Sequence, residues 1–179
     1  MRYFETIKCK NGKAYNLKYH NQRIFNTIGK VFDLEAIISP PNLNLYRCKI
    51  IYTKDSIEDI NYYLYKKKEI KSFKFVYDNS ISYKYKYLNR DCFNSFLDPN
   101  YDEIIIVKNG LITDTSIANI AILVNNSWLT PKKPLLYGTT RERYIKKGIL
   151  KEADITVDMF KKAKQIATLN AMVGFNILK

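Results

Sequence analysis

A lysine near the middle of the chain is the first residue whose setting suggests chemistry. Lys86 lies in the stretch KYKYLNR, residues 84–90, between segments patterned as a strand and as a helix. A lysine is ordinarily a solvated surface charge, and most lysines in this lysine-rich chain are expected to be only that. An amine that is partly buried near other cations loses part of its charge, however, and can then act as a nucleophile or a general base. Lys86 is therefore a candidate catalytic residue if its neighbours support one.

Four further motifs accompany this lysine in a definite order. HNQR at 20–23 precedes it, and GLITDTSIAN at 110–119, WLTP at 128–131 and GTTR at 138–141 follow it. Together with the pattern KxLNR that begins at Lys86, these motifs resemble the class IV aminotransferase and lyase family, whose members use pyridoxal 5′-phosphate. The resemblance extends over nearly the whole chain. It implies an enzyme that depends on this cofactor.

The resemblance assigns parts of the cofactor to particular residues. A pyridoxal enzyme needs a lysine that attaches the cofactor, a group facing the pyridine nitrogen, a phosphate site and packing against the ring. Lys86 matches the lysine, and Leu136 matches the apolar residue on the ring face. Asp114 matches the acidic residue, although the family usually has glutamate there, so the ring must shift or a water must fill the gap. Without the resemblance, a surface aspartate in a turn after Thr113 is a credible interpretation of Asp114, and ordinary loop packing is one of Leu136.

The phosphate site is expected from Arg23 and from the amides of Thr139 and Thr140 at the start of a helix. A guanidinium binds phosphate oxygens in pairs and never loses its charge. A helix N-terminus offers unpaired N–H groups and the positive end of the helix dipole. His20, three residues before Arg23, shares its helix face and is expected to support it.

Two short motifs favour the lyase branch of the family over its transaminases. The first is KxLNR, which begins at Lys86, and the second is the pair Asn170 and Ala171. Family members often offer a hydroxyl from their last conserved strand, and here Asn170 and the backbone amides take its place. The lyases convert 4-amino-4-deoxychorismate to p-aminobenzoate and pyruvate in folate biosynthesis. A branched-chain or D-amino-acid transaminase with the same cofactor residues is the alternative. A relative that has lost the cofactor is a further one, because of Asp114 and the short N-terminus.

The composition leaves one other class of function to weigh. The chain has 179 residues, 46% hydrophobic and 14% aromatic, with a formal net charge of +13. It can bury a core and is not disordered. Such a charge would suit a basic nucleic-acid-binding protein, but the lysines are dispersed apart from KKK at 66–68 and no recognition motif accompanies them. We expect no nucleic acid as partner, and a positive field that attracts an anionic small-molecule substrate.

Neither a membrane-spanning segment nor a metal site is expected. No apolar run approaches the roughly 18 residues that span a bilayer, and the opening MRYFE does not resemble a signal peptide, so a soluble cytoplasmic protein is expected. Three scattered cysteines, Cys9, Cys48 and Cys92, favour free thiols over a disulfide framework or a zinc site. The family tends to form homodimers, and a dimer is expected by resemblance only.

Strands and helices in an α+β arrangement must position these residues. Apolar runs and alternating patterns predict strands at 2–10, 46–52, 60–65, 71–77, 102–107, 111–113, 119–124, 166–172 and 175–178. Helical spacing predicts helices at 17–32, 87–97 and 159–165, and another that follows residues 138–140, with Thr139 or Thr140 as its cap, and runs through Leu150. Lys86 lies where a strand leads into the helix 87–97. A charged connector at 66–70 predicts a small N-terminal α/β domain, 1–69, and a C-terminal cofactor-binding domain, 70–179. The resemblance implies the class IV fold, similar to D-amino-acid aminotransferase, with a shortened N-terminal domain and the cofactor between the two domains.

Overall fold

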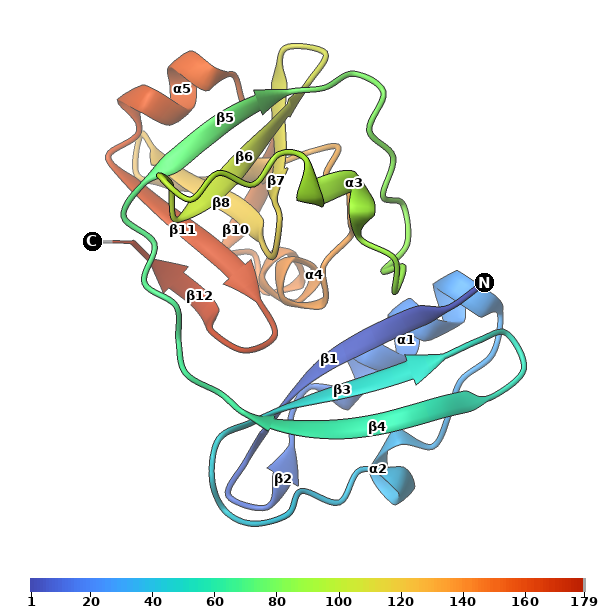
Figure 1. Cartoon of the computed structure of the whole chain (residues 1–179). Coiled ribbons are helices and arrows are strands. Elements are labelled where there is room, and N and C mark those ends of the chain that lie inside the picture. Colours follow the sequence, from blue (N-terminus) through green and yellow to red (C-terminus); the bar gives the residue numbers. More distant parts are fainter. Residues whose placement is uncertain (179) are drawn as a thin grey trace. The chain divides into compact units, whose positions relative to one another are not determined.

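The chain folds into two compact units. The computed structural model describes residues 1–178, and its first unit consists of residues 1–67 with 85–89, while the second consists of 68–84 with the residues from 90 onward (Figure 1). The division after residue 67 lies two residues from the predicted boundary. The segment 85–89, which carries Lys86, belongs to the first unit, whereas the predicted boundary placed it in the second.

Seventeen helices and strands make up the described part of the chain. The first unit contains β1 (Tyr3–Lys10), β2 (Lys13–Ala14), α1 (Leu17–Ile28), α2 (Leu34–Ile37), β3 (Tyr46–Tyr52) and β4 (Ile57–Leu64). The second contains β5 (Phe73–Tyr77), α3 (Asp91–Asn94), β6 (Glu103–Lys108), β7 (Leu111–Thr115), β8 (Asn119–Val124), β9 (Ser127–Pro131), α4 (Thr139–Lys146), β10 (Leu150–Ala153), α5 (Val157–Lys162), β11 (Gln165–Asn170) and β12 (Gly174–Ile177). None of the helices within residues 1–178 is long and apolar enough to cross a membrane.

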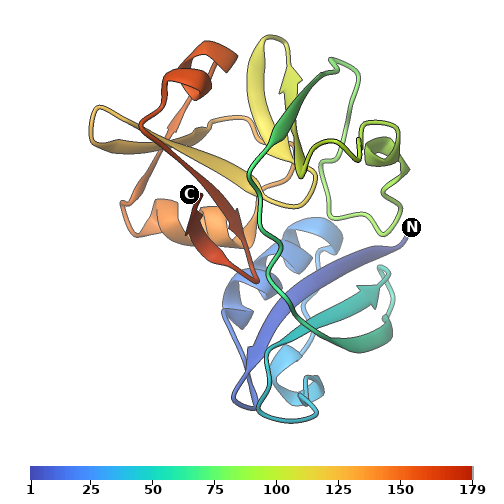
Figure 2. The same cartoon turned by 60° about the vertical axis from the view of Figure 1, so that its left-hand side comes forward.

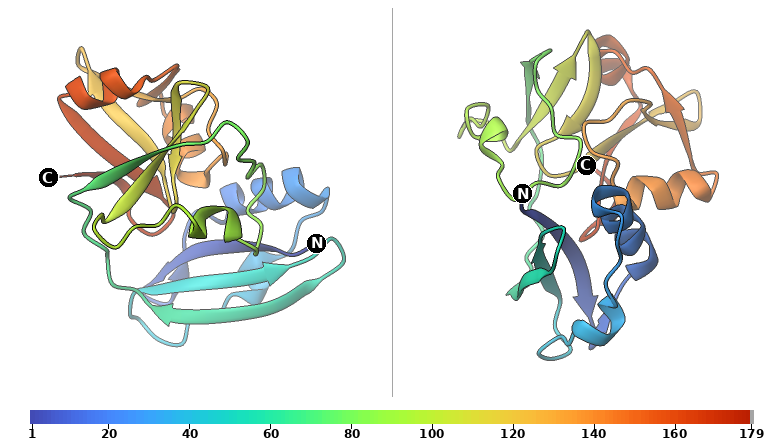
Figure 3. Two further views of the ribbon diagram at one scale, coloured as in Figure 1. Left: turned by 45° about the horizontal axis from the view of Figure 1, so that its top comes forward. Right: turned by 90° about the vertical axis from the view of Figure 1, so that its right-hand side faces the viewer.

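The first unit is a four-stranded antiparallel sheet, in the order β2-β1-β3-β4, with both helices packed on one face (Figure 3). Alternate residues of β1 point to that face, so Ile7 and Cys9 join Ile24 of α1 and Leu34 of α2 in the core. The opposite face of the sheet carries the other residues of β1, β3 and β4.

The backbone around Lys86 lies along β1. The amide of Phe4 donates to the carbonyl of Lys86 at 2.9 Å, and the amide of Leu88 donates to the carbonyl of Arg2 at 3.0 Å. These bonds hold both sides of Lys86 in an extended path, which excludes a helix that begins at residue 87. The predicted helix 87–97 is therefore wrong, and only the short α3, Asp91–Asn94, forms there.

The second unit is an eight-stranded mixed sheet in which β10-β9-β8-β7-β6-β5 form one path and β11 and β12 join through β8 (Figure 2). The pairs β5–β6 and β9–β10 are parallel. Isoleucines of β6, β7 and β8, among them Ile105, Ile112 and Ile120, form one core cluster with Phe160 of α5. A second cluster, which includes Leu150, packs α4 against β8 and β11.

Two helices are shorter than the apolar spacing predicts. α1 ends at Ile28 because Gly29 adopts a φ of 72° and its amide donates to the carbonyl of Phe25 at 2.7 Å. α4 ends at Lys146, and Leu150, predicted as the last residue of the helix, instead begins β10, a strand that pairs with β9.

Candidate active site

A buried glutamate in β1 holds two side chains of α1. Glu5 has no exposed surface, and Nδ1 of His20 lies 2.5 Å from its Oε2. Arg23 donates from Nε to Oε1 at 2.8 Å and from Nη2 to Oε2 at 2.5 Å. Because residues three apart on a helix share a face, His20 and Arg23 reach the same carboxylate.

Burial and pairing set the charges of these three residues. Burial raises the pKa of Glu5, but the charge of Arg23 and the hydrogen bonds from His20 and Arg23 outweigh this and lower it to about 2. Burial lowers the pKa of His20, against the raising effect of Glu5. At neutral pH Glu5 is therefore ionised, Arg23 is charged, and His20 is neutral with its proton on Nδ1.

Arg23 directs one edge of its guanidinium toward Glu5. Nε and one proton of Nη2 form that edge, whereas Nη1 and the other proton of Nη2 form the second edge. The side chain is 12% exposed. Glu5 thus fixes the guanidinium plane, and the second edge has the geometry that binds two oxygens of a phosphate, the role predicted for Arg23.

Lys86 lies in the same unit as Arg23, beside β1. Its Nζ is 4.3 Å from the centroid of the Phe4 ring, and the side chain is partly buried. Besides burial, the charges of Arg23 and Lys86 both lower the pKa of His20. The first unit therefore brings Arg23 and Lys86, both predicted to bind the cofactor, to the surroundings of His20.

In the second unit a buried aspartate accepts two hydrogen bonds. Oδ1 of Asp114 accepts from Nδ2 of Asn119 at 2.6 Å, and its Oδ2 accepts from the amide of Leu136 at 2.9 Å. Asn119 also donates to the carbonyl of Leu136 at 2.8 Å, which closes the three residues into one network. Asp114 and Leu136, both predicted to contact the cofactor ring, are thus held together through Asn119, which was not predicted.

Burial raises the pKa of Asp114 to about 7, although the amide of Leu136, the side chain of Asn119 and the charge of Arg141 act in the other direction. Among residues 1–178, no cationic side chain forms an ion pair with this carboxylate. A cationic group placed beside Asp114 would favour its charged form. Its environment therefore suits a partner with a protonated nitrogen.

A glycine makes room for the Asn119 side chain. A Cβ on Gly138 would lie 1.9 Å from Oδ1 of Asn119. The φ of Gly138 is −76°, so space and not backbone conformation requires glycine here. Gly138 is the N-cap of α4, and the first helical residues, Thr139 and Thr140, are buried. The helix N-terminus predicted to bind phosphate thus begins next to the Asp114 network.

Replacing Gly138 by alanine should lower the free energy of unfolding by roughly 2–3 kcal/mol, because the methyl group displaces Asn119 and breaks its hydrogen bonds. Urea denaturation followed by circular dichroism measures this loss. In an Asn119→Ala background the methyl group has room, so the same glycine substitution should cost only about 1 kcal/mol or less, as alanine does at an N-cap. Equal costs in the two backgrounds would contradict the steric explanation.

Asn170 and Ala171 lie at the turn between β11 and β12. Oδ1 of Asn170 accepts hydrogen bonds from the amides of Met172 and Val173, both at 3.0 Å. This is the way asparagine stabilises a turn through its own side chain. The side-chain oxygen of Asn170 is thus occupied within the turn. A cofactor contact by Asn170 or Ala171 stays a prediction, and it would have to use the side-chain NH2 group of Asn170 or the backbone of the two residues.

Both sequence and fold match known proteins over most of the chain. A protein of Haemophilus influenzae (strain Rd), of uncharacterized function, is 33% identical over 184 residues, which cover 96% of this chain and 97% of the relative. The model of the family described as amino-transferase class IV matches residues 85–177. The chain belongs to the class IV aminotransferase family. It is accordingly an enzyme of the aminotransferase and lyase kind, as the sequence predicted.

Solved structures confirm the predicted class IV fold. A proposed 4-amino-4-deoxychorismate lyase from Haemophilus somnus 129PT is 32% identical, with a TM-score of 0.88 and 97% of each chain covered. A proposed amino-acid aminotransferase from Mesorhizobium loti shares the fold at 17% identity, with a TM-score of 0.81 and coverage of 99% of this chain and 98% of that one. A hypothetical aminotransferase from Mycobacterium tuberculosis, in a form with pyridoxal phosphate bound, does so at 15% identity, with a TM-score of 0.78 and coverage of 99% and 80%.

This class IV protein contains a buried arginine whose partners the sequence did not reveal. Arg141 is 2% exposed, and its Nη2 donates to the carbonyl of Pro131 at 2.8 Å and to Glu152 at 2.5 Å. These contacts fasten the first turn of α4 to β9 and β10. The arginine of the GTTR motif therefore positions the helix N-terminus, and its charge also acts on Asp114.

The residue types in each unit fit pyridoxal phosphate, the cofactor of the class IV family. In the first unit, Lys86 offers an amine and Arg23 a guanidinium edge suited to the phosphate. In the second, Asp114 is a buried carboxylate suited to a cationic ring nitrogen, and α4 offers its N-terminal amides at Thr139 and Thr140. Each chemical part of the cofactor thus has a matching group in the chain.

Proposed function

We propose that this chain is a pyridoxal-phosphate-dependent lyase that converts 4-amino-4-deoxychorismate to p-aminobenzoate and pyruvate. The observation that carries the proposal is the arrangement of Lys86 and Arg23 around the Glu5 and His20 pair, which places an amine and an arginine oriented by Glu5 in the same unit. The 32% identity to the Haemophilus somnus protein, over 97% of both chains, supports the choice of reaction.

Each residue would have a distinct part in the reaction. When bound, pyridoxal phosphate supplies an electron sink for the carbon next to the substrate amine. Lys86 would attach the cofactor through Nζ and, when freed, would act as the general base that takes the proton from the ring carbon bearing the substrate amine. Asp114 would keep a proton on the pyridine nitrogen, while Arg23 and the amides of Thr139 and Thr140 would bind the phosphate. The C–O bond to the enolpyruvyl group would then break, and this group would take up a proton at its methylene carbon to leave as pyruvate. The remaining ring is aromatic, which makes the reaction irreversible.

A class IV amino-acid transaminase is the competing proposal. It would use the same cofactor residues, so the geometry around Lys86 and Asp114 does not discriminate between the two reactions. The KxLNR motif and the pair Asn170 and Ala171 favour the lyase. The discrimination therefore has to come from the products.

The experiment begins with the absorbance spectrum of the purified chain with pyridoxal phosphate, before and after borohydride. A band that borohydride changes, with the cofactor mass fixed on the peptide that contains Lys86, would support the cofactor assignment. Equal amounts of p-aminobenzoate and pyruvate from 4-amino-4-deoxychorismate, without exchange of amino groups between amino and keto acids, would support the lyase. Exchange without these products would support the transaminase, and no cofactor uptake would overturn both.

A further inference from the structure

The face of the first sheet opposite its helices carries a row of hydrogen-bond donors near Lys86. Thr6 of β1 pairs with Lys49 of β3, and Lys49 pairs with Asn61 of β4, so the three side chains lie in one row across the sheet. They present a hydroxyl, an ammonium and an amide group, each of which donates hydrogen bonds. A row of this kind is suited to an anion.

Lys49 reaches the aromatic ring over which Lys86 lies. Nζ of Lys49 is 5.4 Å and Nζ of Lys86 is 4.3 Å from the centroid of the Phe4 ring. The two nitrogens are therefore no farther apart than the sum of these distances. A small molecule that binds beside the amine of Lys86 can consequently extend far enough to meet the ammonium group of Lys49.

The charge of Lys49 has no acidic partner within residues 1–178, and its side chain is only partly exposed. On the same face of β4, Asp59 lies diagonally across from Lys49, but Nδ2 of Asn61 donates to the Asp59 carboxylate. An ammonium group that has no acidic partner of its own can donate charge-assisted hydrogen bonds to an anion. The position thus favours a negatively charged ligand group.

We propose that Lys49, with Thr6 and Asn61 beside it, binds a carboxylate of the substrate that reacts beside Lys86. This inference rests on the proposed function and adds a substrate requirement to it: a carboxylate at some distance from the reacting amine. Lys49 is a substrate-positioning residue, because it acts on an end of the substrate remote from the reacting atoms. The phosphate of the cofactor is assigned to Arg23, so loss of Lys49 leaves cofactor binding intact.

Lys49→Met tests the proposal, since it keeps the length of the side chain and removes the charge. We expect KM for 4-amino-4-deoxychorismate to rise roughly 10- to 100-fold, the usual effect of losing a charged hydrogen bond, with kcat changed less than about threefold. Lys49→Arg should keep most of the affinity. Inhibition by p-aminobenzoate and by pyruvate, measured separately, shows which carboxylate Lys49 binds, because only that product should inhibit the methionine variant less.

Lys8→Met is the matched control, because Lys8 lies on the same face of β1, one row farther from Phe4, and carries the same charge. Its KM should stay within about twofold of the wild-type value. An unchanged KM in Lys49→Met, an equal rise in Lys8→Met, or loss of cofactor binding in Lys49→Met would each overturn the proposal while the lyase stands. Failure of the wild-type chain to take up cofactor or to turn over the substrate would instead refute the proposed function itself, before any variant is compared.

Discussion

Lys86→Ala is expected to lower turnover by about 10⁴-fold or more and to leave no cofactor fixed to the chain after borohydride treatment. In the proposed reaction the amine of Lys86 would both attach the cofactor and move the substrate proton, so one substitution would remove two functions. The fold should survive, because the amide of Phe4 in β1 donates to the backbone carbonyl of residue 86, and alanine keeps this carbonyl. Turnover of 4-amino-4-deoxychorismate and the mass of the borohydride-treated protein measure the two effects.

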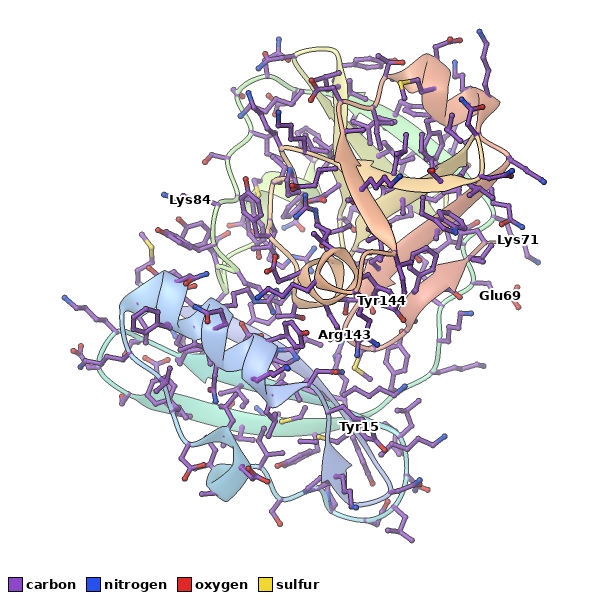
Figure 4. All side chains as sticks on the ribbon, turned by 180° about the vertical axis from the view of Figure 1, so that it is seen from behind. Tyr15, Glu69, Lys71, Lys84, Arg143 and Tyr144 are labelled. Carbon is purple, nitrogen blue, oxygen red and sulfur yellow. The ribbon has the colours of Figure 1, made fainter. Side chains whose placement is uncertain are left out.

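Lys84→Ala is the matched control for this experiment. Lys84 lies two residues before Lys86 in the same segment, and its side chain is exposed (Figure 4). Its removal changes the net charge equally and should leave turnover within about twofold of wild type. A cofactor mass that remains on the Lys86→Ala protein would show that another lysine attaches it, and would refute the assignment of the catalytic residue.

The local elements of this fold could be predicted because their signals lie in adjacent residues. Asn11 and Gly12 form the turn from β1 to β2 with positive φ angles of 52° and 71°, as the NG pattern indicates. The apolar run that becomes β6 is buried along five of its six residues. Such patterns report on burial and turn geometry directly, without knowledge of the rest of the chain.

The place of Lys86 could not be predicted in the same way. The segment 85–89 belongs to the first unit because its backbone bonds to Arg2 and Phe4, more than 80 residues away in sequence. The apolar spacing of the residues that follow indicates a helix, and nothing local signals the competing strand-like pairing. Long-range backbone pairing therefore overrides the local pattern at the position where the candidate catalytic residue lies.

The residues that hold the site were the ones that sequence reasoning missed. Glu5 stands at an inward position of β1, between residues that face the core, so a buried charge with partners could have been inferred from the alternation. Asn119 gave no such signal, because its partners Asp114 and Leu136 come from separate segments. The motifs identify groups that would touch the cofactor, whereas the structure adds the groups that orient them.

Asp114→Asn is expected to change stability and activity in opposite directions. The pKa of Asp114 is about 7 in the folded protein, because of burial, against an ordinary value of 3.8. Between these pH values the folded state keeps a proton that the unfolded state has lost, so the free energy of unfolding falls as the pH rises, by on the order of 4 kcal/mol. Asparagine does not titrate, so the variant should lack this fall.

Comparison of the wild-type protein with Asp114→Asn, both free of cofactor, isolates the effect of the Asp114 pKa on stability. Glu5 and His20 have lowered pKa values, so the stability that they contribute is lost on acidification, below about 6.5 for His20 and from about 4.5 toward 2 for Glu5. Both proteins share that loss, and it cancels in their difference. Chemical denaturation near pH 4 and near pH 8 should therefore show asparagine favoured at the higher pH by the amount that Asp114 loses. A difference that does not vary with pH would refute a raised pKa at Asp114.

The same substitution should cost roughly 10²- to 10³-fold in kcat once the cofactor is added, because a neutral amide cannot hold a proton on the pyridine nitrogen as a carboxylate does. Asp114→Glu, which restores the usual residue of the family, should keep kcat within about tenfold if the ring can shift by the length of one methylene group. A stabilised but inactive asparagine variant, beside an active glutamate variant, would mean that the buried carboxylate is retained for catalysis at the expense of stability. Equal activity of all three proteins would place the ring nitrogen against some other group.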